Sequence, residues 1–575
     1  MNICFAAADR IFKPVSDMNP EFAGGYVKDA GSESTTSLFA VRNSTAAFQL
    51  LLRADEDYIL TVDDKPYFSQ HGQKPQLRLG AVCDLPVKMN IVDMNIAEDG
   101  KCYGDALLSS PSVEIAAGQT RSVYVEIEAK KDAASGIHDF SVSLYLHRML
   151  EPETKIGALE GSIEVSPYIL HDVRENKFHL DLWQHPSNLA RKAETPLWSD
   201  AHFAVIDRYL KSLGELGQKA VTIVASDAPW SGQGCGGSDS QANMYEYGII
   251  SAKKKADGRL ECDYTAMQRY IDIAAKYGID REISVYGLCN VWSQAENGFV
   301  KPAEDYPDGL RIRYLDEKDG CYKYMDCAAD IESYIVGLEQ YFVRTGQIDR
   351  VRLAADEPGD IELYRRILTR LHEIAPAFKF KAAINHSEFI GEFGEEVYDF
   401  APFISGMTKE YKALKGYQAT MPGKRFLYYI CCGPQFPNNF ITSPLVESDY
   451  MPVLASAAGF DGMLRWSYNI WPDHPREDSR YSFWRTGDTH IVYPQPDGSP
   501  LLTLRWKEFR RGIELYEMLE ELKAKDPAAA GNAYAMVMKT TDIEAVGKAE
   551  KPEDMYESDI NAYINMERFI AGKLI

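Results

Sequence analysis

The sequence predicts a multi-domain protein in which an N-terminal β-sandwich precedes a (β/α)8 barrel and a short helical tail. Three observations support this fold class. Short runs of alternating apolar and polar residues fill the first part of the chain, a strand-then-helix rhythm repeats eight times after it, and the last part is helical and polar. Because 575 residues exceed the size at which one core keeps growing, we expect domains over 1–167 and 168–525 and a tail over 526–575.

The first domain shows the period-two pattern of strands that have one buried face. Apolar residues alternate with polar ones in two clear runs: Val123, Val125, Ile127, and then Phe140, Val142, Leu144, Leu146. Turn residues separate such runs throughout 1–167. This pattern predicts a β-sandwich.

The second domain changes to short apolar strands, each followed by a helical segment. The predicted strands are 177–184, 220–226, 282–288, 350–355, 380–385, 403–407, 425–431 and 462–469. The helices between them show apolar spacings of three and four, as in Phe203, Ile206, Leu210 and Leu213. Eight such units predict a (β/α)8 barrel whose reactive groups lie at the carboxyl ends of the strands.

The fourth predicted strand ends in two adjacent carboxylates, Asp356 and Glu357, followed by Pro358. Where a strand gives way to a loop, neighbouring side chains can both turn to the barrel mouth. Two close carboxylates cannot both ionise freely, so one pKa rises, and glycosidic cleavage needs a protonated acid beside a carboxylate. The alternative is that Asp356 caps a helix beginning near Gly359 and Glu357 forms a surface ion pair. The place at a barrel strand end favours the catalytic interpretation.

Aromatic, amide and imidazole side chains follow the other predicted strands. The candidates for substrate contacts are Trp183, Gln184, His185, Trp230, Asn385, His386, Tyr429, Trp466, Tyr468 and Trp471. Aromatic faces pack on the apolar faces of sugar rings, and amide and imidazole groups bind hydroxyls. Any one of these tryptophans could equally be a core residue, so the prediction of a carbohydrate site depends on their convergence.

The seventh predicted strand lacks the second carboxylate that a conventional retaining glycosidase needs. It is followed by Cys431, Cys432, Gly433, Pro434 and Gln435, and the next acid is Glu447. This favours a mechanism in which the 2-acetamido oxygen of the substrate attacks the anomeric carbon while the protein supplies one stabilising carboxylate and one acid.

Other features of the sequence exclude several classes of protein. The net charge of -23 disfavours nucleic acid and anionic membrane surfaces as partners. We find no long apolar segment and no signal-peptide pattern, and so expect a cytoplasmic protein. The run 232–237 matches G-x-G-x-x-G but no amphipathic helix follows it, and no metal-ligand spacing occurs. We expect no cofactor and no metal.

Several segments resemble glycoside hydrolase family 123 and related barrels. The similar segments are 178–186, 355–358, 428–432, 437–440, 461–469, 478–480, 487–489 and 492–494. The resemblance implies a β-N-acetylgalactosaminidase that works by substrate assistance without a metal or cofactor. It assigns the acetamido-stabilising role to Asp356 and the general acid/base role to Glu357.

Two other functions remain open at this point. One is a glycosidase of different specificity, for N-acetylglucosamine or an uncommon sugar, in which Glu357 is the acid and Asp181, Asp227 or Asp473 is the base. The other is a non-catalytic carbohydrate-binding protein, against which the intact pair of carboxylates argues.

Overall fold

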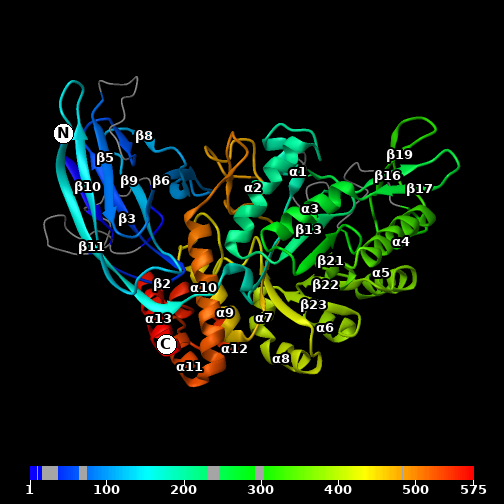
Figure 1. The fold of residues 1–575 in the computed structure, drawn as a ribbon. Coiled ribbons are helices and arrows are strands. Elements are labelled where there is room, and N and C mark those ends of the chain that lie inside the picture. The colour runs from blue at the N-terminus through cyan, green and yellow to red at the C-terminus, as the bar shows by residue number, and fades with distance from the viewer. Residues whose placement is uncertain (9–10, 16–35, 64–73, 230–244, 292–302, 482–483) are drawn as a thin grey trace.

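The computed structural model describes residues 1–8, 11–15, 36–63, 74–229, 245–291, 303–481 and 484–575. Figure 1 shows a strand-rich N-terminal domain beside a larger domain in which helices surround parallel strands. The last helices lie below the junction of the two. This arrangement confirms an α/β protein with a strand-rich first domain and a helical C-terminal tail.

The N-terminal domain contains two sheets that share one apolar core. The first has the order β1 (Ile3–Ala7), β3 (Ser44–Ala54), β9 (Arg121–Ala129), β6 (Val87–Ile96) and β7 (Cys102–Leu107). The second has the order β2 (Thr36–Arg42), β11 (Thr154–Ile169), β10 (Gly136–His147), β5 (Gln76–Cys83), β4 (Tyr58–Thr61) and β8 (Ser112–Ile115). Val125 of β9 and Val142 of β10 meet in this core, as their alternation predicts.

The larger domain is built on eight parallel strands. Their order is β12 (His179–Leu182), β25 (Gly462–Arg465), β24 (Arg425–Ile430), β23 (Val397–Pro402), β22 (Lys379–Ile384), β21 (Val351–Asp356), β18 (Glu282–Tyr286) and β13 (Ala220–Val224). The end strands approach each other, because Lys219 N donates to Leu180 O at 3.0 Å. The sheet is therefore a nearly closed barrel.

Helices alternate with these strands along the chain, as predicted. They are α1 (Pro186–Lys192), α2 (Asp200–Leu216), α3 (Thr265–Lys276), α4 (Ala328–Arg344), α5 (Ile361–Ile374), α6 (Glu388–Phe393), α7 (Ile404–Lys409), α8 (Tyr411–Thr420), α9 (Glu447–Ala458) and α10 (Leu504–Lys525). Small strands β14 (Ala228–Pro229), β15 (Tyr245–Glu246), β16 (Ser251–Lys254), β17 (Leu260–Asp263), β19 (Arg313–Asp316), β20 (Tyr322–Tyr324), β26 (Tyr493–Pro494) and β27 (Pro500–Leu501) lie in the connections.

One predicted strand is wrong. Residues 403–407 were expected to be the sixth strand, but the strand is β23 and α7 begins at Ile404. A short apolar run does not distinguish a strand from a buried helical turn. Asp399 interrupts the apolar pattern of β23, so the segment does not match the pattern of a buried strand. Its side chain is nevertheless fully buried and accepts from Arg352 Nε at 3.0 Å.

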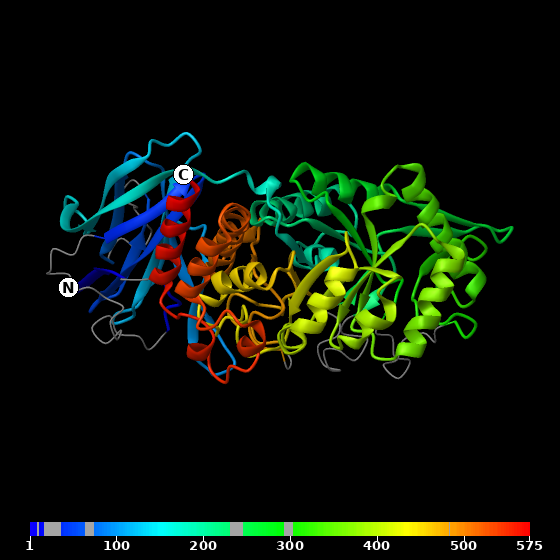
Figure 2. The ribbon, with the colours of Figure 1, turned by 90° about the horizontal axis from the view of Figure 1, so that it is seen from below.

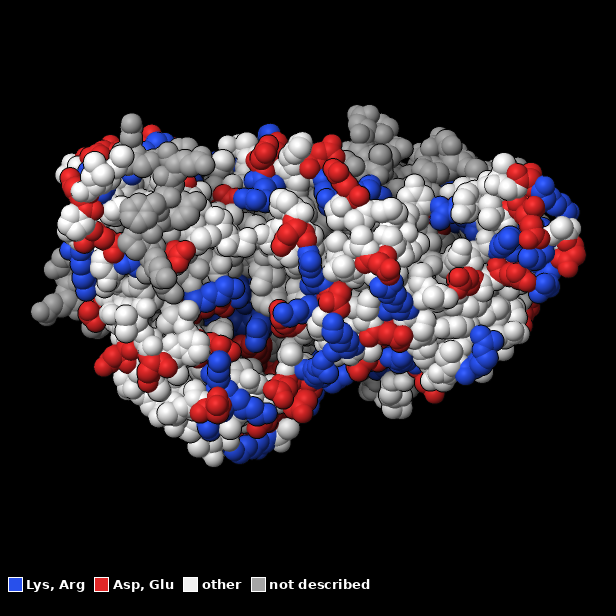
Figure 3. All heavy atoms as spheres, turned by 45° about the horizontal axis from the view of Figure 1, so that its top comes forward, with Lys and Arg blue, Asp and Glu red and all other residues white. Residues whose placement is uncertain are grey.

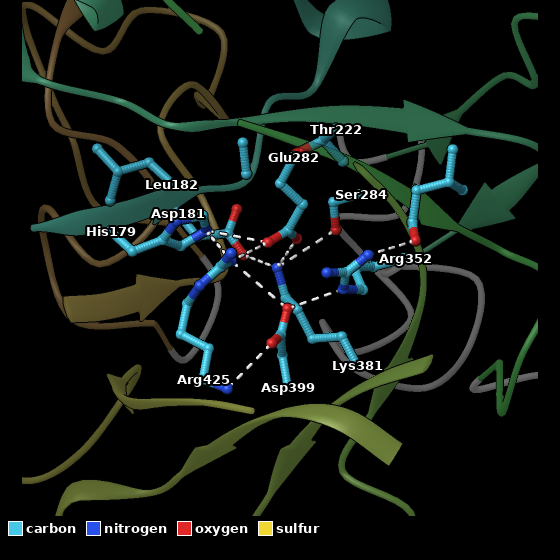
Figure 4. A network of polar contacts seen from close by, with 12 residues as sticks. His179, Asp181, Leu182, Thr222, Glu282, Ser284, Arg352, Lys381, Asp399 and Arg425 are labelled. Carbon is cyan, nitrogen blue, oxygen red and sulfur yellow. Dashed lines mark hydrogen bonds and ion pairs between the residues drawn. The ribbon is translucent and has the colours of Figure 1, made fainter. Parts of the chain in front are cut away.

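The amino-terminal half of the barrel interior holds a buried layer of charges (Figure 4). Glu282 accepts from Arg425 at 2.7 Å and lies 2.9 Å from His179 Nε2. Lys381 donates to both Asp181 and Glu282. Since all of these side chains point into the barrel, the charges compensate one another where water is excluded.

Above the charged layer, the barrel interior becomes apolar. Ala354, Ala383 and Ala401 face inward from three neighbouring strands, and Leu427 and Leu464 face them. The alternation of the strands then brings Trp183, Tyr286, Tyr429 and Trp466 to the next layer, at the carboxyl ends. An apolar layer thus separates the buried layer of charges, here called the charged floor of the barrel, from the aromatic residues at its mouth.

The C-terminal helices join the two domains. Helices α11 (Pro527–Val537), α12 (Ile543–Val546) and α13 (Ile560–Leu574) follow α10, and Figure 2 shows α13 along the strands of the first domain. In α10, Arg505 donates to Asp105 of β7 at 2.8 and 2.9 Å, with both side chains buried. The domain limits stay predictions, although β11 and α10 end at Ile169 and Lys525, close to them.

On the face drawn in Figure 3, Lys and Arg side chains are interspersed with Asp and Glu side chains. Within the described ranges, none of the helices combines the length and the apolar character that crossing a membrane requires.

Candidate active site

Asp356 and Glu357 lie together where β21 ends at the barrel mouth. Glu357 has a φ of +40°, in the left-handed region, and its N–H donates to Ala383 O of β22 at 2.9 Å. A non-glycine residue in this region is uncommon and marks a backbone that its surroundings hold in place. The cap of α5 is Asp360, whose Oδ1 accepts from Leu363 N at 2.9 Å, so the alternative in which Asp356 caps this helix is wrong.

Residues at the ends of two other barrel strands, β24 and β18, hold the carboxylate pair. The hydroxyl of Tyr429, at the end of β24, donates to Oε1 of Glu357. Asn290, which follows β18 and has a φ of 49°, donates its amide to the carbonyl of Asp356 at 2.8 Å. The pair is therefore oriented from both sides of β21.

The two carboxyl groups are also coupled electrostatically. Burial, and then the charge of Glu357, raise the pKa of Asp356 to about 8. The sequence led us to expect one raised pKa, and the structure assigns it to Asp356. With this pKa, Asp356 is largely protonated at neutral pH in the substrate-free enzyme.

Aromatic rings cluster at the carboxyl ends of the barrel strands, in the layer that includes Tyr429. Trp183 and Tyr286 lie with ring centroids 5.3 Å apart, and Trp466 and Trp484 lie 4.7 Å apart with planes inclined by 35°. Tyr429 lies in the same cluster. Trp183, Tyr286 and Tyr429 are almost completely buried, whereas Trp484 is partly exposed.

Two predicted contact residues lie in the barrel wall. Gln184 is buried, and its Oε1 accepts from Thr222 N at 2.7 Å. His185 is buried, with Nε2 2.9 Å from Trp466 O, and burial lowers its pKa to about 3. These two side chains brace the strands beneath the mouth.

The other predicted contact residues are divided between the surface and the outer core. Asn385 and His386 follow β22 and are exposed. Tyr468 and Trp471 are fully buried on the helix side, where Tyr468 OH lies 2.8 Å from Ser212 Oγ of α2 and Trp471 donates to Val492 O at 2.7 Å. The structure does not bring these two to the mouth. Trp230 lies outside the described residues.

The sequence patterns assigned no role to Trp484 or Asp488. Asp488 is buried and accepts from Arg465 at 2.9 Å and from Trp466 Nε1 at 3.3 Å, and burial raises its pKa to about 6. It thereby fixes the ring of Trp466. Both residues belong to the long connection after β25, which has no periodicity that could have revealed them.

The alternative bases lie in different surroundings. Asp181 is paired with Lys381 in the charged floor. Asp227 accepts from Arg313 at 3.1 Å and from Tyr324 at 2.8 Å, and Asp473 is exposed. Asp181 and Asp227 thus form ion pairs with basic side chains of the barrel domain.

In the described part of the chain, no group of three or more His, Cys, Asp or Glu side chains is arranged to hold a metal ion.

Comparison with known families identifies this barrel. The profile described as "Glycoside hydrolase 123, catalytic domain" matches residues 183–522. The chain belongs to glycoside hydrolase family 123. This membership supports glycosidase activity on a carbohydrate substrate, and the matched range includes the barrel mouth with Asp356 and Glu357.

One solved structure agrees with this family at the level of the fold. A family 123 glycoside hydrolase from Clostridium perfringens is similar over 100% of this chain and 98% of its own, with a TM-score of 0.77 and 16% identity. A putative glycoside hydrolase from Bacteroides vulgatus has a TM-score of 0.33 and 10% identity over 78% of each chain. None of the curated proteins matches this chain.

Proposed function

We propose that this family 123 member is an exo-acting β-N-acetylgalactosaminidase that retains configuration through an oxazoline intermediate. The observation that carries the proposal is the adjacent Asp356 and Glu357 at the end of β21, with Tyr429 on Glu357. At the end of β24, a common place for the nucleophile of a retaining glycosidase, this chain has Cys431 and Cys432.

The two carboxyl groups take different roles in this mechanism. Glu357 protonates the glycosidic oxygen, and the acetamido oxygen attacks the anomeric carbon, which closes the oxazoline ring. Asp356 accepts the acetamido N–H and stabilises the positive charge as it develops. Glu357 then removes a proton from the water that opens the ring.

The raised pKa keeps Asp356 largely protonated in the free enzyme at neutral pH, whereas this mechanism needs Asp356 ionised and Glu357 protonated. Substrate binding favours this change of protonation. The acetamido N–H donates to the ionised form of Asp356, and the glycosidic oxygen accepts from the protonated form of Glu357. Both hydrogen bonds favour transfer of the proton within the pair.

The C. perfringens relative supports the type of substrate. Its structure is described in terms of glycolipid glycan hydrolysis. The proposal extends this to a terminal 2-acetamido sugar for the present chain, with the rings of Trp183 and Trp466 as contacts for the sugar.

Hydrolysis of aryl β-glycosides tests the proposal. We expect cleavage of the N-acetylgalactosaminide, weaker cleavage of the N-acetylglucosaminide and almost none of the galactoside, which lacks the acetamido nucleophile. A thiazoline mimic of the intermediate should inhibit far more strongly than the product sugar. Brisk cleavage of the galactoside, or a glycosyl-enzyme adduct seen by mass spectrometry, would contradict the mechanism.

A further inference from the structure

Two adjacent thiols lie at the rim of the active site. Cys431 and Cys432 directly follow β24, and their sulfur atoms are 3.8 Å apart. Cys431 is half-buried and Cys432 is exposed. Neither has a role in the proposed glycosidase chemistry.

The turn that carries the two thiols is held by hydrogen bonds. Cys431 N donates to Gly433 O at 3.0 Å. The buried amide of Asn438 donates to Cys431 O at 3.1 Å and to Pro434 O at 2.8 Å. The fold therefore keeps the two sulfur atoms close to each other.

The pair has one reactive member. The hydrogen bond from the Cys431 thiol lowers the pKa of Cys432. The exposed sulfur of Cys432 is thus the better nucleophile toward a reagent from solvent, and the protonated Cys431 is its resolving partner.

We propose that Cys431 and Cys432 form a redox modification site, at which a small-molecule disulfide converts the two thiols into a vicinal disulfide and lowers the activity of the enzyme. The Cys432 thiolate attacks one sulfur of the reagent and displaces a thiolate, which leaves a mixed disulfide. Cys431 then loses its proton to the displaced thiolate and attacks Cys432 Sγ, releasing the second half of the reagent. The protein loses two electrons and two protons, and the reagent becomes two thiols.

The geometry connects this reaction to the carboxylate pair. Tyr429, which orients Glu357, is two residues before Cys431, and Cys432 is close enough to Glu357 for their charges to interact. Bonding shortens the sulfur separation from 3.8 Å to about 2.05 Å. Neighbouring Cα atoms are only about 3.8 Å apart, below the usual range of about 4.4–6.8 Å for disulfides, so ring closure must distort the turn. The distortion displaces Tyr429, and the strain makes the bond easy to reduce.

The test uses the full chain incubated with oxidised glutathione. We expect mass spectrometry to show a loss of two hydrogens in the peptide that contains Cys431 and Cys432, with no retained glutathione. The kcat/KM for the aryl N-acetylgalactosaminide should fall at least tenfold and return when dithiothreitol is added. Cys431→Ser and Cys432→Ser should each prevent the intramolecular bond and keep their own starting activity. Cys321→Ser, which removes an exposed thiol elsewhere, should respond as the unaltered protein does.

Three results would overturn the inference. The first is a stable glutathione adduct, or an unmodified peptide, in place of the intramolecular bond. The second is an intramolecular bond without loss of activity. The third is a loss of activity in the two serine variants as large as in the unaltered protein. The activity readout depends on the proposed function, but the mass readout does not. An enzyme inactive on every aryl glycoside would thus refute the proposed function, and the absence of bond formation would refute the redox site.

Discussion

Tyr429 donates a hydrogen bond to Glu357 across two intervening strands, from the end of β24 to the end of β21. Tyr429→Phe removes this bond from a group that has to hold one orientation while it gives and takes a proton. A hydrogen bond to a charged group contributes about 1.5–3 kcal/mol, so we expect kcat to fall by roughly 10–100-fold. Steady-state kinetics on the aryl N-acetylgalactosaminide will measure this.

The neighbouring Tyr428 provides a matched control. It is buried on the opposite face of β24, where its hydroxyl donates to Met451 O at 2.7 Å. Tyr428→Phe should lower the free energy of unfolding by about 1 kcal/mol and leave kcat/KM nearly unchanged. Equal kinetic losses in the two variants would contradict a specific role for Tyr429.

Glu357→Gln tests the general acid. The amide cannot protonate the departing oxygen, so we expect kcat for a natural disaccharide to fall by about 10²–10⁴-fold. A dinitrophenyl glycoside, whose leaving group needs no proton, should lose much less in the first step. Circular dichroism should show an unchanged fold, and near-normal turnover of the disaccharide would remove Glu357 from this role.

Asp356→Asn tests the acetamido-stabilising carboxylate and has opposite effects on activity and stability. The folded protein binds a proton at Asp356 more tightly than the unfolded chain does, because the pKa is raised to about 8. The contribution of Asp356 to the free energy of unfolding therefore falls as the pH rises from about 4, the pKa of an aspartate in the unfolded chain, toward 8. The asparagine variant should lose most of its kcat but gain on the order of 1 kcal/mol of unfolding free energy above pH 8. This gain should vanish near pH 4, and a variant less stable at pH 8 would contradict the account.

The sequence predicted the fold more completely than the contacts of the site. The alternation of strands and helices predicted seven of the eight barrel strands and the position of the carboxylates at a strand end. The strand over β23 was missed because Asp399 pairs with Arg352 inside the barrel, and no local pattern reveals a polar group that a distant residue neutralises.

The substrate contacts were harder to predict for a related reason. Trp466 and Trp471 are five residues apart, yet one ring lies at the mouth and the other packs on Tyr209 of the helix layer. The side to which each ring points depends on how the chain turns after β25, and that turn is set by contacts such as Asp488 with Trp466.

The pH dependence follows from the shared proton. The active form of the pair carries one proton, and in the free enzyme that proton is held with a pKa of about 8. Above this value Asp356 is ionised and the pair no longer holds this proton, so kcat/KM should fall about tenfold per pH unit. A profile of kcat/KM from pH 5 to 10 will show the limb, and Asp356→Asn should displace it. A limb below pH 6 would contradict the coupling of the two groups.

The charged floor of the barrel gives a prediction about stability that is independent of catalysis. Lys381 is buried and holds the carboxylates of Asp181 and Glu282 together, so Lys381→Met leaves two buried acids without their shared cation. Breaking a buried pair in this way costs about 3–5 kcal/mol, whereas an exposed pair contributes less than about 1 kcal/mol. The control is Lys379→Met in the same strand, because Lys379 lies 3.3 Å from the exposed carboxylate of Asp349. Urea unfolding at pH 7 should therefore separate the two variants by several kcal/mol. Lower pH should narrow the difference, since protonation removes the unpaired charges that Lys381→Met leaves behind. Equal stability of the two variants at pH 7 would show that the buried layer does not depend on its lysine.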